Sequence, residues 1–282
     1  MESKSSKDIY DKLMGKPLKL KKPEEKKYDY GFIKTSNVTL SNSESEICII
    51  LSHADTHEKK ELLHECLESV KIPKLISSHY PVDTDTQSLS NWTLYDYDND
   101  LLLESEYKKY NLSYYYWKID DDGKMITKNQ SYEHGYAVYK LIKNALMFSK
   151  SLGKTIAHIV NYDYLIPSQM LIENSAILKD YDVVLYTDES NMLGQQYCTG
   201  LFSGNIDALL AFFQHYENKD QYYLDLETET VSTIWIEGKI FKFYKTRDFK
   251  IMEKSIDALK KQAIYQDDLK IDRVTLMRGT FD

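Results

Sequence analysis

The chain has 282 residues, enough for one large domain or two small ones, and 42% of them are hydrophobic, as in globular proteins. Its net charge of −8 disfavours a nucleic-acid partner. No run approaches the ~20 apolar residues of a membrane span, and no signal peptide is recognisable, so we expect a cytoplasmic protein without a transmembrane segment. The three cysteines, Cys48, Cys66 and Cys198, are far apart, and two of them occupy apolar positions of predicted elements. They are therefore expected to be reduced core residues rather than disulfides or metal ligands.

Residues 1–45 are polar and lysine-rich, with clusters such as Lys19-Leu20-Lys21-Lys22. This pattern predicts a solvated N-terminal extension. A weak contact with an anionic membrane surface or a partner is the alternative, because each lysine near such a surface adds about 1 kcal/mol. Acidic residues interspersed up to Lys27 weaken that alternative.

Residues 46–245 alternate between short apolar runs and segments with apolar residues at helical spacing. Strands followed by helices predict an α/β fold, with a mostly parallel sheet flanked by helices in a single main domain. Gly153 is expected to end the predicted helix that contains residues 138–146. The predicted strands are 47–51, 74–77, 92–95, 156–160 and 182–186, and the predicted helices cover 62–70, 138–146 and 206–213.

Residues 246–282 are charged and loosely periodic, with apolar residues at Ile251, Ile256, Leu259 and Ile264. This spacing predicts a C-terminal helix packed on the domain, followed by a polar tail. The segment carries no chemical motif.

The most informative segment is the apolar run Ile156–Val160, which stops at Asn161-Tyr162-Asp163. A continuous apolar run reads as a central strand covered on both faces. Ligands of open α/β sheets bind beyond the carboxyl ends of such strands, so Asn161 and Asp163 are placed where chemistry would occur. The Asn-x-Asp resembles the Asp-x-Asp motif of nucleotide-sugar glycosyltransferases with the GT-A fold.

The order of elements over about residues 46–240 also resembles a family-two-type glycosyltransferase, whose fold is GT-A type and Rossmann-like. The resemblance implies a hexosyl- or pentosyltransferase that binds a nucleotide sugar at one end of the sheet. The motif departs from the family pattern at Asn161, and the second strand ends in Ser77-Ser78-His79-Tyr80 instead of the usual Asp-Asp. By this resemblance the donor-binding positions are Ser52, His53, Asp55, Asp96, Asp98, His134, Gly135 and Asn161.

The resemblance also implies specific chemistry. Asp163 would ligate Mn²⁺ or Mg²⁺, which neutralises the charge that builds on a leaving diphosphate. Glu227 or Glu229 would take the proton from the acceptor hydroxyl in an inverting transfer. A UDP-sugar is the favoured donor, and a glycan or glycoconjugate is the expected acceptor. Plainer roles stay open, because an Asp after a strand also forms turns and acids in a first helical turn also complement the helix dipole.

A zinc-dependent hydrolase is the first alternative. His53-x-Asp55-x-His57 follows one predicted strand and His79 follows the next, a spacing that could bind Zn²⁺. Such an enzyme implies a barrel of about 250 residues with eight strand–helix units, and the strand count falls short. Asp55 and Thr56 are better explained as a helix N-cap and its loop.

A non-enzymatic carbohydrate-binding protein is the second alternative, because Tyr114-Tyr115-Tyr116-Trp117 could stack on sugars. Aromatic residues in a strand are more often packing residues. The nearby Asp120-Asp121-Asp122-Gly123 fits an Asp-x-Asp search, but it lies between two strand-like runs, 114–119 and 124–127. Asp-Gly in that position predicts a hairpin turn rather than a metal site.

Overall fold

A computed structural model describes residues 45–97, 100–110, 112–119, 125–129, 132–187, 197–225, 236–255, 264–265 and 273–278. These residues belong to one unit, 33–282. The predicted extension before Ser45 and three predicted site residues, Asp98, Glu227 and Glu229, lie outside this description.

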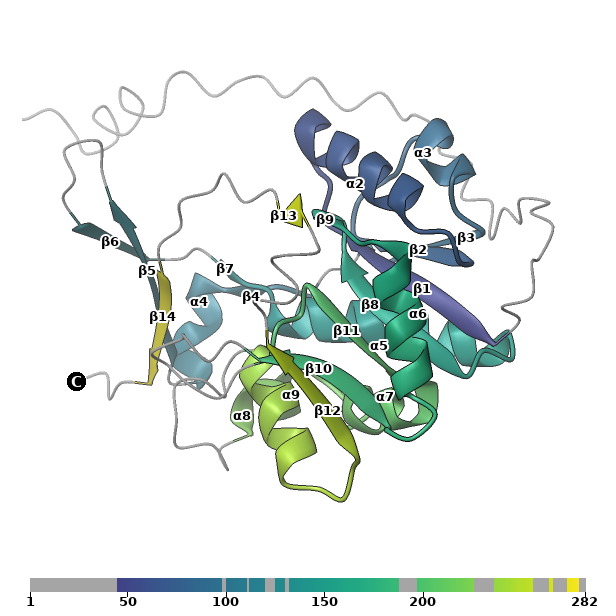
Figure 1. The fold of residues 1–282 in the computed structure, drawn as a ribbon. Coiled ribbons are helices and arrows are strands. Elements are labelled where there is room, and N and C mark those ends of the chain that lie inside the picture. The colour runs from purple at the N-terminus through teal and green to yellow at the C-terminus, as the bar shows by residue number, and fades with distance from the viewer. Residues whose placement is uncertain are drawn as a thin grey trace, which may run out of the picture. The chain divides into compact units, whose positions relative to one another are not determined.

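A seven-stranded sheet forms the centre of the fold (Figure 1), in the order β12-β10-β11-β8-β1-β2-β3. β11 runs antiparallel to both of its neighbours, and every other neighbouring pair is parallel. The predicted α/β class with a mostly parallel sheet is therefore confirmed. The strands are β1 (Glu46–Ser52), β2 (Lys74–Ser78), β3 (Trp92–Tyr95), β8 (Ile156–Asn161), β10 (Val183–Thr187), β11 (Leu201–Asn205) and β12 (Ile251–Ser255).

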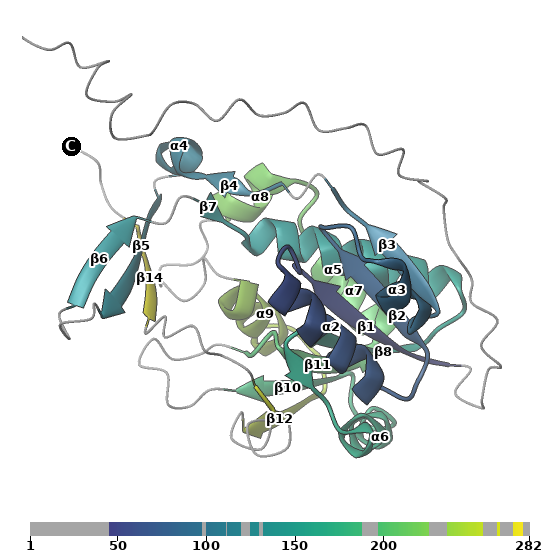
Figure 2. The same cartoon turned by 90° about the horizontal axis from the view of Figure 1, so that it is seen from above.

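Helices cover both faces of this sheet (Figure 2). α2 (His57–Ser69) and α6 (Ser168–Ile177) pack on one face, and α5 (Gly135–Ser151), α7 (Ile206–Phe213) and α9 (Ile236–Lys245) pack on the other. Successive residues of a strand point to opposite faces, so Ile47 and Ile49 enter one core while Cys48 and Ile50 enter the other. Burial on both faces explains why β1 contains the continuous apolar run Ile47–Leu51.

Shorter elements complete the described chain. Among the residues that the structure describes, no helix has the length and apolar character needed to cross a membrane. The remaining helices are α3 (Thr84–Ser88), α4 (Glu104–Tyr107), the 3₁₀ turn η1 (Lys108–Tyr110) and α8 (Lys219–Leu224). The remaining strands are β4 (Leu102–Leu103), β5 (Leu112–Ile119), β6 (Met125–Asn129), β7 (Tyr132–Glu133), β9 (Tyr164–Leu165), β13 (Ile264–Tyr265) and β14 (Arg273–Arg278).

Two local predictions about chain reversals agree with the structure. α5 ends at Ser151, and Gly153 follows with a φ of 76°, the left-handed conformation that favours glycine after a helix. β5 and β6 pair antiparallel with Ile119 opposite Met125, which confirms the hairpin predicted around Asp120-Asp121-Asp122-Gly123. The turn residues 120–124 themselves lie outside the described residues.

The helix predicted from residue 246 onward is wrong where the structure describes it. Ile251–Ser255 forms strand β12, which pairs in parallel with β10, Val183 opposite Ile251. The Lys250 amide also donates to the Asp182 carboxylate at 2.8 Å. Ladder hydrogen bonds to a distant strand outweigh a weak local helical period, so the sheet continues beyond residue 245. Ile256 and Leu259 lie outside the described residues.

We expect Phe212→Ala to lower the free energy of unfolding by about 3–5 kcal/mol, the usual cost of removing a buried aromatic ring. Phe212 is fully buried on α7 and contacts the rings of Tyr139, Phe213 and Phe243. Urea denaturation measures the change. Ile172→Ala on α6 is the control, because that side chain is 57% exposed and should cost within about 0.5 kcal/mol. Equal losses of unfolding free energy in both variants would contradict the burial of Phe212 among these aromatic rings.

Candidate active site

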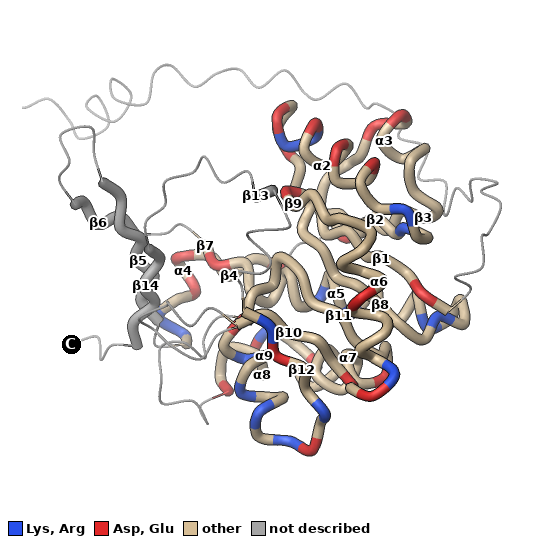
Figure 3. The backbone as a smooth tube through the Cα atoms, in the orientation of Figure 1, with Lys and Arg blue, Asp and Glu red and all other residues tan. Residues whose placement is uncertain are grey.

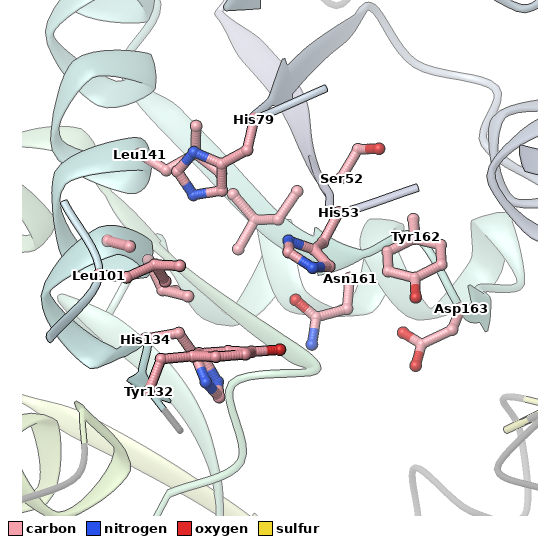
Figure 4. Close-up of a pocket in the computed structure, with 13 residues that line it drawn as sticks. Ser52, His53, His79, Leu101, Tyr132, His134, Leu141, Asn161, Tyr162 and Asp163 are labelled. Atoms are coloured by element: carbon pink, nitrogen blue, oxygen red, sulfur yellow. The ribbon is translucent and has the colours of Figure 1, made fainter. Parts of the chain in front are cut away.

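A pocket of about 240 Å³ opens where three neighbouring parallel strands end (Figure 4). β1, β2 and β8 are adjacent in the sheet, so their carboxyl ends meet at one edge. The first half of α5 and the chain leading to it form the opposite wall. The pocket is lined by Leu51, Ser52, His53, His79, Leu101, Tyr132, His134, Ala137, Val138, Leu141, Asn161, Tyr162 and Asp163.

Asn161 and Asp163 lie at the β8 end of the pocket, as their position after an apolar strand predicts. Asn161 ends the strand, and its backbone N–H donates to the Gly200 carbonyl at 3.0 Å. The amide of Tyr162 donates to the Leu51 carbonyl at 3.0 Å, which ties this turn to β1. In Figure 4 the Asn161 and Asp163 side chains extend from the same edge of the sheet. An amide oxygen and a carboxylate are therefore presented together.

The negative charge of Asp163 contributes to a raised pKa of two neighbouring groups. Burial raises the pKa of the Cys66 thiol to about 12, and the Asp163 carboxylate contributes to that rise. Burial likewise raises the pKa of Tyr162 to about 12, with Asp163 and Asp55 adding to it. Cys66 thus stays a protonated, reduced thiol in the core, as predicted from its apolar position.

Ser52, His53 and His134 complete the predicted residues that the structure brings into this pocket. Ser52 is buried, and its hydroxyl accepts from the Ala54 amide at 3.3 Å. The His53 ring meets the Tyr80 ring edge-on at 5.0 Å. Burial lowers the pKa of His53, and Lys59 lowers it further, so this imidazole is neutral at neutral pH. His134 stands directly before α5, across the pocket from Asn161 (Figure 4).

Three other predicted donor-binding residues are near the pocket but do not line it. Asp55 pairs with Lys59 at 2.6 Å, and Thr56 caps α2 by accepting from the Lys59 amide, as the capping interpretation predicted. Asp96 pairs with Lys140 at 3.4 Å. Gly135 begins α5 in close packing, since a Cβ there would lie 2.8 Å from Glu133 Oε1. These positions support the walls of the pocket.

The residues of the predicted zinc site do not form one group, because only His53 and His79 line the pocket. The His57 side chain is 81% exposed and lies 3.4 Å from Glu61, while Asp55 is held by Lys59. Within the described ranges no three His, Cys, Asp or Glu side chains are grouped so as to hold a metal ion. For the carbohydrate-binding alternative, Tyr114–Trp117 lie in β5, whose side chains are outside the description.

Several pocket residues were not among the predicted donor contacts. His79 directly follows β2 and was considered only as a zinc ligand in the hydrolase alternative, although its place after a strand also indicated a position at this edge. Leu101 and Tyr132 come from the chain between β3 and α5, and no local pattern singles them out. α2 leaves the pocket edge with acidic residues along its exposed side (Figure 3), among them Glu58, Glu61 and Glu65. Lys59 and Lys60 lie on the same helix, so α2 carries charges of both signs.

Glu133 is a buried acid next to the wall of the pocket. It lies between the pocket residues Tyr132 and His134, and it accepts hydrogen bonds from the Gly135 amide, at 2.7 Å, and from the Tyr223 hydroxyl. Burial raises the pKa of Glu133 above its ordinary 4.5, against the opposing effects of His134 and these two hydrogen bonds. The folded protein therefore binds the Glu133 proton more tightly than the unfolded chain does.

We expect the free energy of unfolding of Glu133→Gln to increase relative to that of the wild type as pH rises. A raised pKa in the folded state means that the contribution of Glu133 is complete below about 4.5 and is lost as pH rises through the folded-state pKa. Glutamine cannot ionise, so it escapes this loss. Urea denaturation of both proteins at pH 5 and pH 8 measures the difference. Glu173→Gln, at an exposed acid on α6, is the matched control. A difference for Glu133→Gln that does not change with pH would contradict the expectation.

Comparison with known proteins gives distant likenesses. No protein-family model and no curated protein matches the chain. Among solved structures, a glycosyltransferase involved in the glycosylation of the major capsid of PBCV-1 has 10% identity and a TM-score of 0.42, over 78% of this chain and 93% of that one. The galactosyltransferase LgtC in complex with donor and acceptor sugar analogues has 9% identity and a TM-score of 0.41, over 79% and 81%. A cytidylyltransferase from Leptospira borgpetersenii has 12% identity and a TM-score of 0.41, over 75% and 76%. Such likenesses are too distant to assign an activity.

Proposed function

We propose that the protein is a glycosyltransferase that moves a sugar from a nucleotide-diphosphate donor to a hydroxyl of a glycan or glycoconjugate. One observation carries the proposal: Ser52, His53, Asn161 and Asp163, chosen from the sequence as donor or metal contacts, line a single pocket. His134 joins them from the opposite wall. The pocket lies beyond the carboxyl ends of parallel strands, where open α/β sheets bind their ligands.

The residues at the β8 end fit a divalent cation. Mg²⁺ in enzymes is held by one or two carboxylates together with substrate phosphates and water, and it does not need an all-protein cage. Asp163 would supply the carboxylate oxygen, and Asn161 an amide oxygen or a contact to ribose or water. Bound Mn²⁺ or Mg²⁺ would neutralise the charge on the donor diphosphate.

Different parts of the protein would bind the donor and carry out the reaction. The pocket of about 240 Å³ is smaller than the ~300–1,000 Å³ that encloses a drug-sized ligand, so it suits one moiety of the donor, which we assign to the nucleoside. In the transfer, the acceptor oxygen bonds to the anomeric carbon and the bond from that carbon to the diphosphate oxygen breaks. The acceptor proton passes to a carboxylate, for which Glu227 and Glu229 remain the candidates. A single displacement of this kind inverts the anomeric configuration.

Binding and turnover of nucleotide sugars test this proposal directly. UDP-, GDP- and CDP-sugars are added to the full chain with and without Mn²⁺, and the unfolding temperature and donor hydrolysis are recorded. A donor present at one hundred times its Kd should stabilise the fold by about 2.7 kcal/mol. A protein that binds glycans but neither binds nor hydrolyses any of these donors would be a carbohydrate-binding protein, and the proposal would be wrong.

A further inference from the structure

Two tyrosines at the end of the edge strand β3, Tyr95 and Tyr97, present stacked rings to solvent. Their ring centroids are 5.2 Å apart, and the ring planes differ by 9°. Tyr95 is 36% exposed and Tyr97 is 50% exposed. Among the residues whose burial the structure describes, every other Tyr, Phe and Trp side chain is less exposed. Adjacent apolar groups that stay exposed mark surfaces for interaction.

Hydrogen bonds hold the Tyr95 ring in place. Its hydroxyl accepts from the Val82 backbone N–H at 3.3 Å and from the side-chain amide of Gln87 at 2.9 Å. Gln87 lies on α3, next to β3 (Figure 1), and its amide also donates to the Val82 carbonyl at 2.6 Å. A ring fixed at its hydroxyl and stacked on its neighbour loses little conformational entropy when a ligand binds. The pair is therefore a pre-formed surface.

The two rings face away from the pocket. Asp96, between them, continues the pairing with β2, since its backbone N–H donates to the Ser78 carbonyl at 3.0 Å. The Asp96 carboxylate points to α5, where it lies 3.4 Å from Lys140, and α5 forms a wall of the pocket. Successive residues of an extended chain point to opposite sides, so Tyr95 and Tyr97 point toward α3 instead. Neither tyrosine lines the pocket, so a molecule stacked on them would leave it accessible.

The surroundings of the rings are acidic. Asp83 and Asp85 are exposed at the start of α3, and Figure 3 shows the acidic residues of this helix. Burial raises the pKa of Tyr95, and the Asp83 carboxylate adds to the rise, so its charge acts on the ring. Negative charge here disfavours anionic partners such as nucleotides, nucleic acids and acidic membranes. Two rings also expose far less than the ~800 Å² per partner that a standard protein interface buries. A small neutral ligand fits both observations.

Neutral sugars have the complementary surface. A pyranose whose substituents are equatorial carries only C–H bonds on its faces, and their slight positive charge packs against the negative face of an aromatic ring. Its hydroxyl groups, at the rim, can donate to carboxylates such as that of Asp85. We propose that Tyr95 and Tyr97 form a binding subsite for a neutral glycan, outside the pocket. This subsite goes beyond the proposed function and does not depend on it. In a glycosyltransferase it would hold a glycan chain close to the enzyme.

Titration of the full chain with oligosaccharides, followed by NMR, tests the inference. Cellotetraose and chitotetraose are the neutral probes, and a heparin tetrasaccharide is the anionic probe. We expect a neutral probe to bind with an affinity that changes less than about twofold between about 50 and about 500 mM NaCl, because the ligand has no charge to be screened. If neither neutral probe binds at about 5 mM, or if the anionic probe binds more tightly, the inference is wrong.

Variants of Tyr97 then assign the binding to the ring. Tyr97→Ala should weaken binding of the neutral probe by at least about 10-fold, whereas Tyr97→Phe keeps the ring and should stay within about threefold of the wild type. Met147→Ala is the matched control, because that apolar side chain on α5 is 47% exposed. All three side chains are exposed at the surface, so the unfolding temperatures should stay close to that of the wild type. Unchanged affinity in Tyr97→Ala would overturn the inference.

Competition with nucleotides separates this subsite from the pocket. UDP, GDP and CDP, each with Mn²⁺, should not displace the neutral probe, and Tyr97→Ala should bind any accepted nucleotide as the wild type does. Displacement of the glycan by a nucleotide would place the rings in the donor site, which contradicts this inference and leaves the proposed function standing. If no nucleotide sugar binds, the proposed function fails, while the tetrasaccharide titrations and the Tyr97 variants still decide whether this subsite exists.

Discussion

Asp163→Ala should abolish Mn²⁺-dependent binding of the donor while leaving the fold intact. We expect at least a roughly 100-fold loss of affinity, because a carboxylate that helps a hard cation to hold a diphosphate has no substitute in alanine. Asp163 lies in the turn after β8 at the edge of the pocket, not in either hydrophobic core. Its removal should therefore leave both hydrophobic cores intact. Titration of a UDP- or GDP-sugar with and without Mn²⁺ measures the effect.

Asn161→Ala is the matched comparison, since Asn161 lies two residues earlier in the same turn and lines the same pocket. An amide oxygen is a weaker ligand for such a cation than a carboxylate, so this variant should lose less affinity. The unfolding temperature of both variants without ligand should stay close to that of the wild type. Donor affinity that is unchanged in Asp163→Ala would remove this residue from the site.

Glu227→Gln should lower turnover by about 10²–10⁴ while donor affinity holds, if Glu227 is the general base. Glutamine preserves the shape of the side chain but cannot take a proton from the acceptor hydroxyl. Glu227 lies outside the described residues, so this expectation rests on the resemblance and on the need for a carboxylate on the acceptor side. Rates are measured at saturating donor and acceptor, and donor affinity is measured separately.

Glu229→Gln is the matched comparison for this experiment, because Glu229 lies two residues further on and is the second candidate for the base. Its effect on turnover should be milder. Full turnover in both variants would place the base elsewhere in the chain. The anomeric configuration of the product, read by NMR, gives an independent check, since retention would contradict a single displacement.

The elements that the sequence predicted well are those whose local pattern and burial agree. Ile47–Leu51 is apolar at every position, Ile156–Val160 is apolar at every position except His158, and both are central strands covered on two faces. The helical spacing from Val138 to Leu146 marks the face of α5 that packs on the sheet. In these segments the spacing of the apolar residues already predicts which face of the helix or strand is buried.

Predictions failed where a distant partner decided the structure. Ile251–Ser255 became an edge strand because β10 offers it a ladder of hydrogen bonds, although its local spacing suggested a helix. The direction of β11, antiparallel to β8 and β10, has no signature in Leu201–Asn205 itself. Strand direction depends on where the chain arrives from, which a short window of residues does not contain.

The candidate site divides in the same way. By themselves, the residues of the sequence determined that Ser52, His53, Asn161 and Asp163 follow buried strands, and hence that they would share one edge of a parallel sheet. Only the tertiary structure placed Leu101, Tyr132 and α5 opposite them and left His57 exposed to solvent. The first result follows from hydrophobic periodicity, which is local. The second depends on contacts between segments far apart in the chain, whose geometry exists only once the cores on both faces of the sheet have packed.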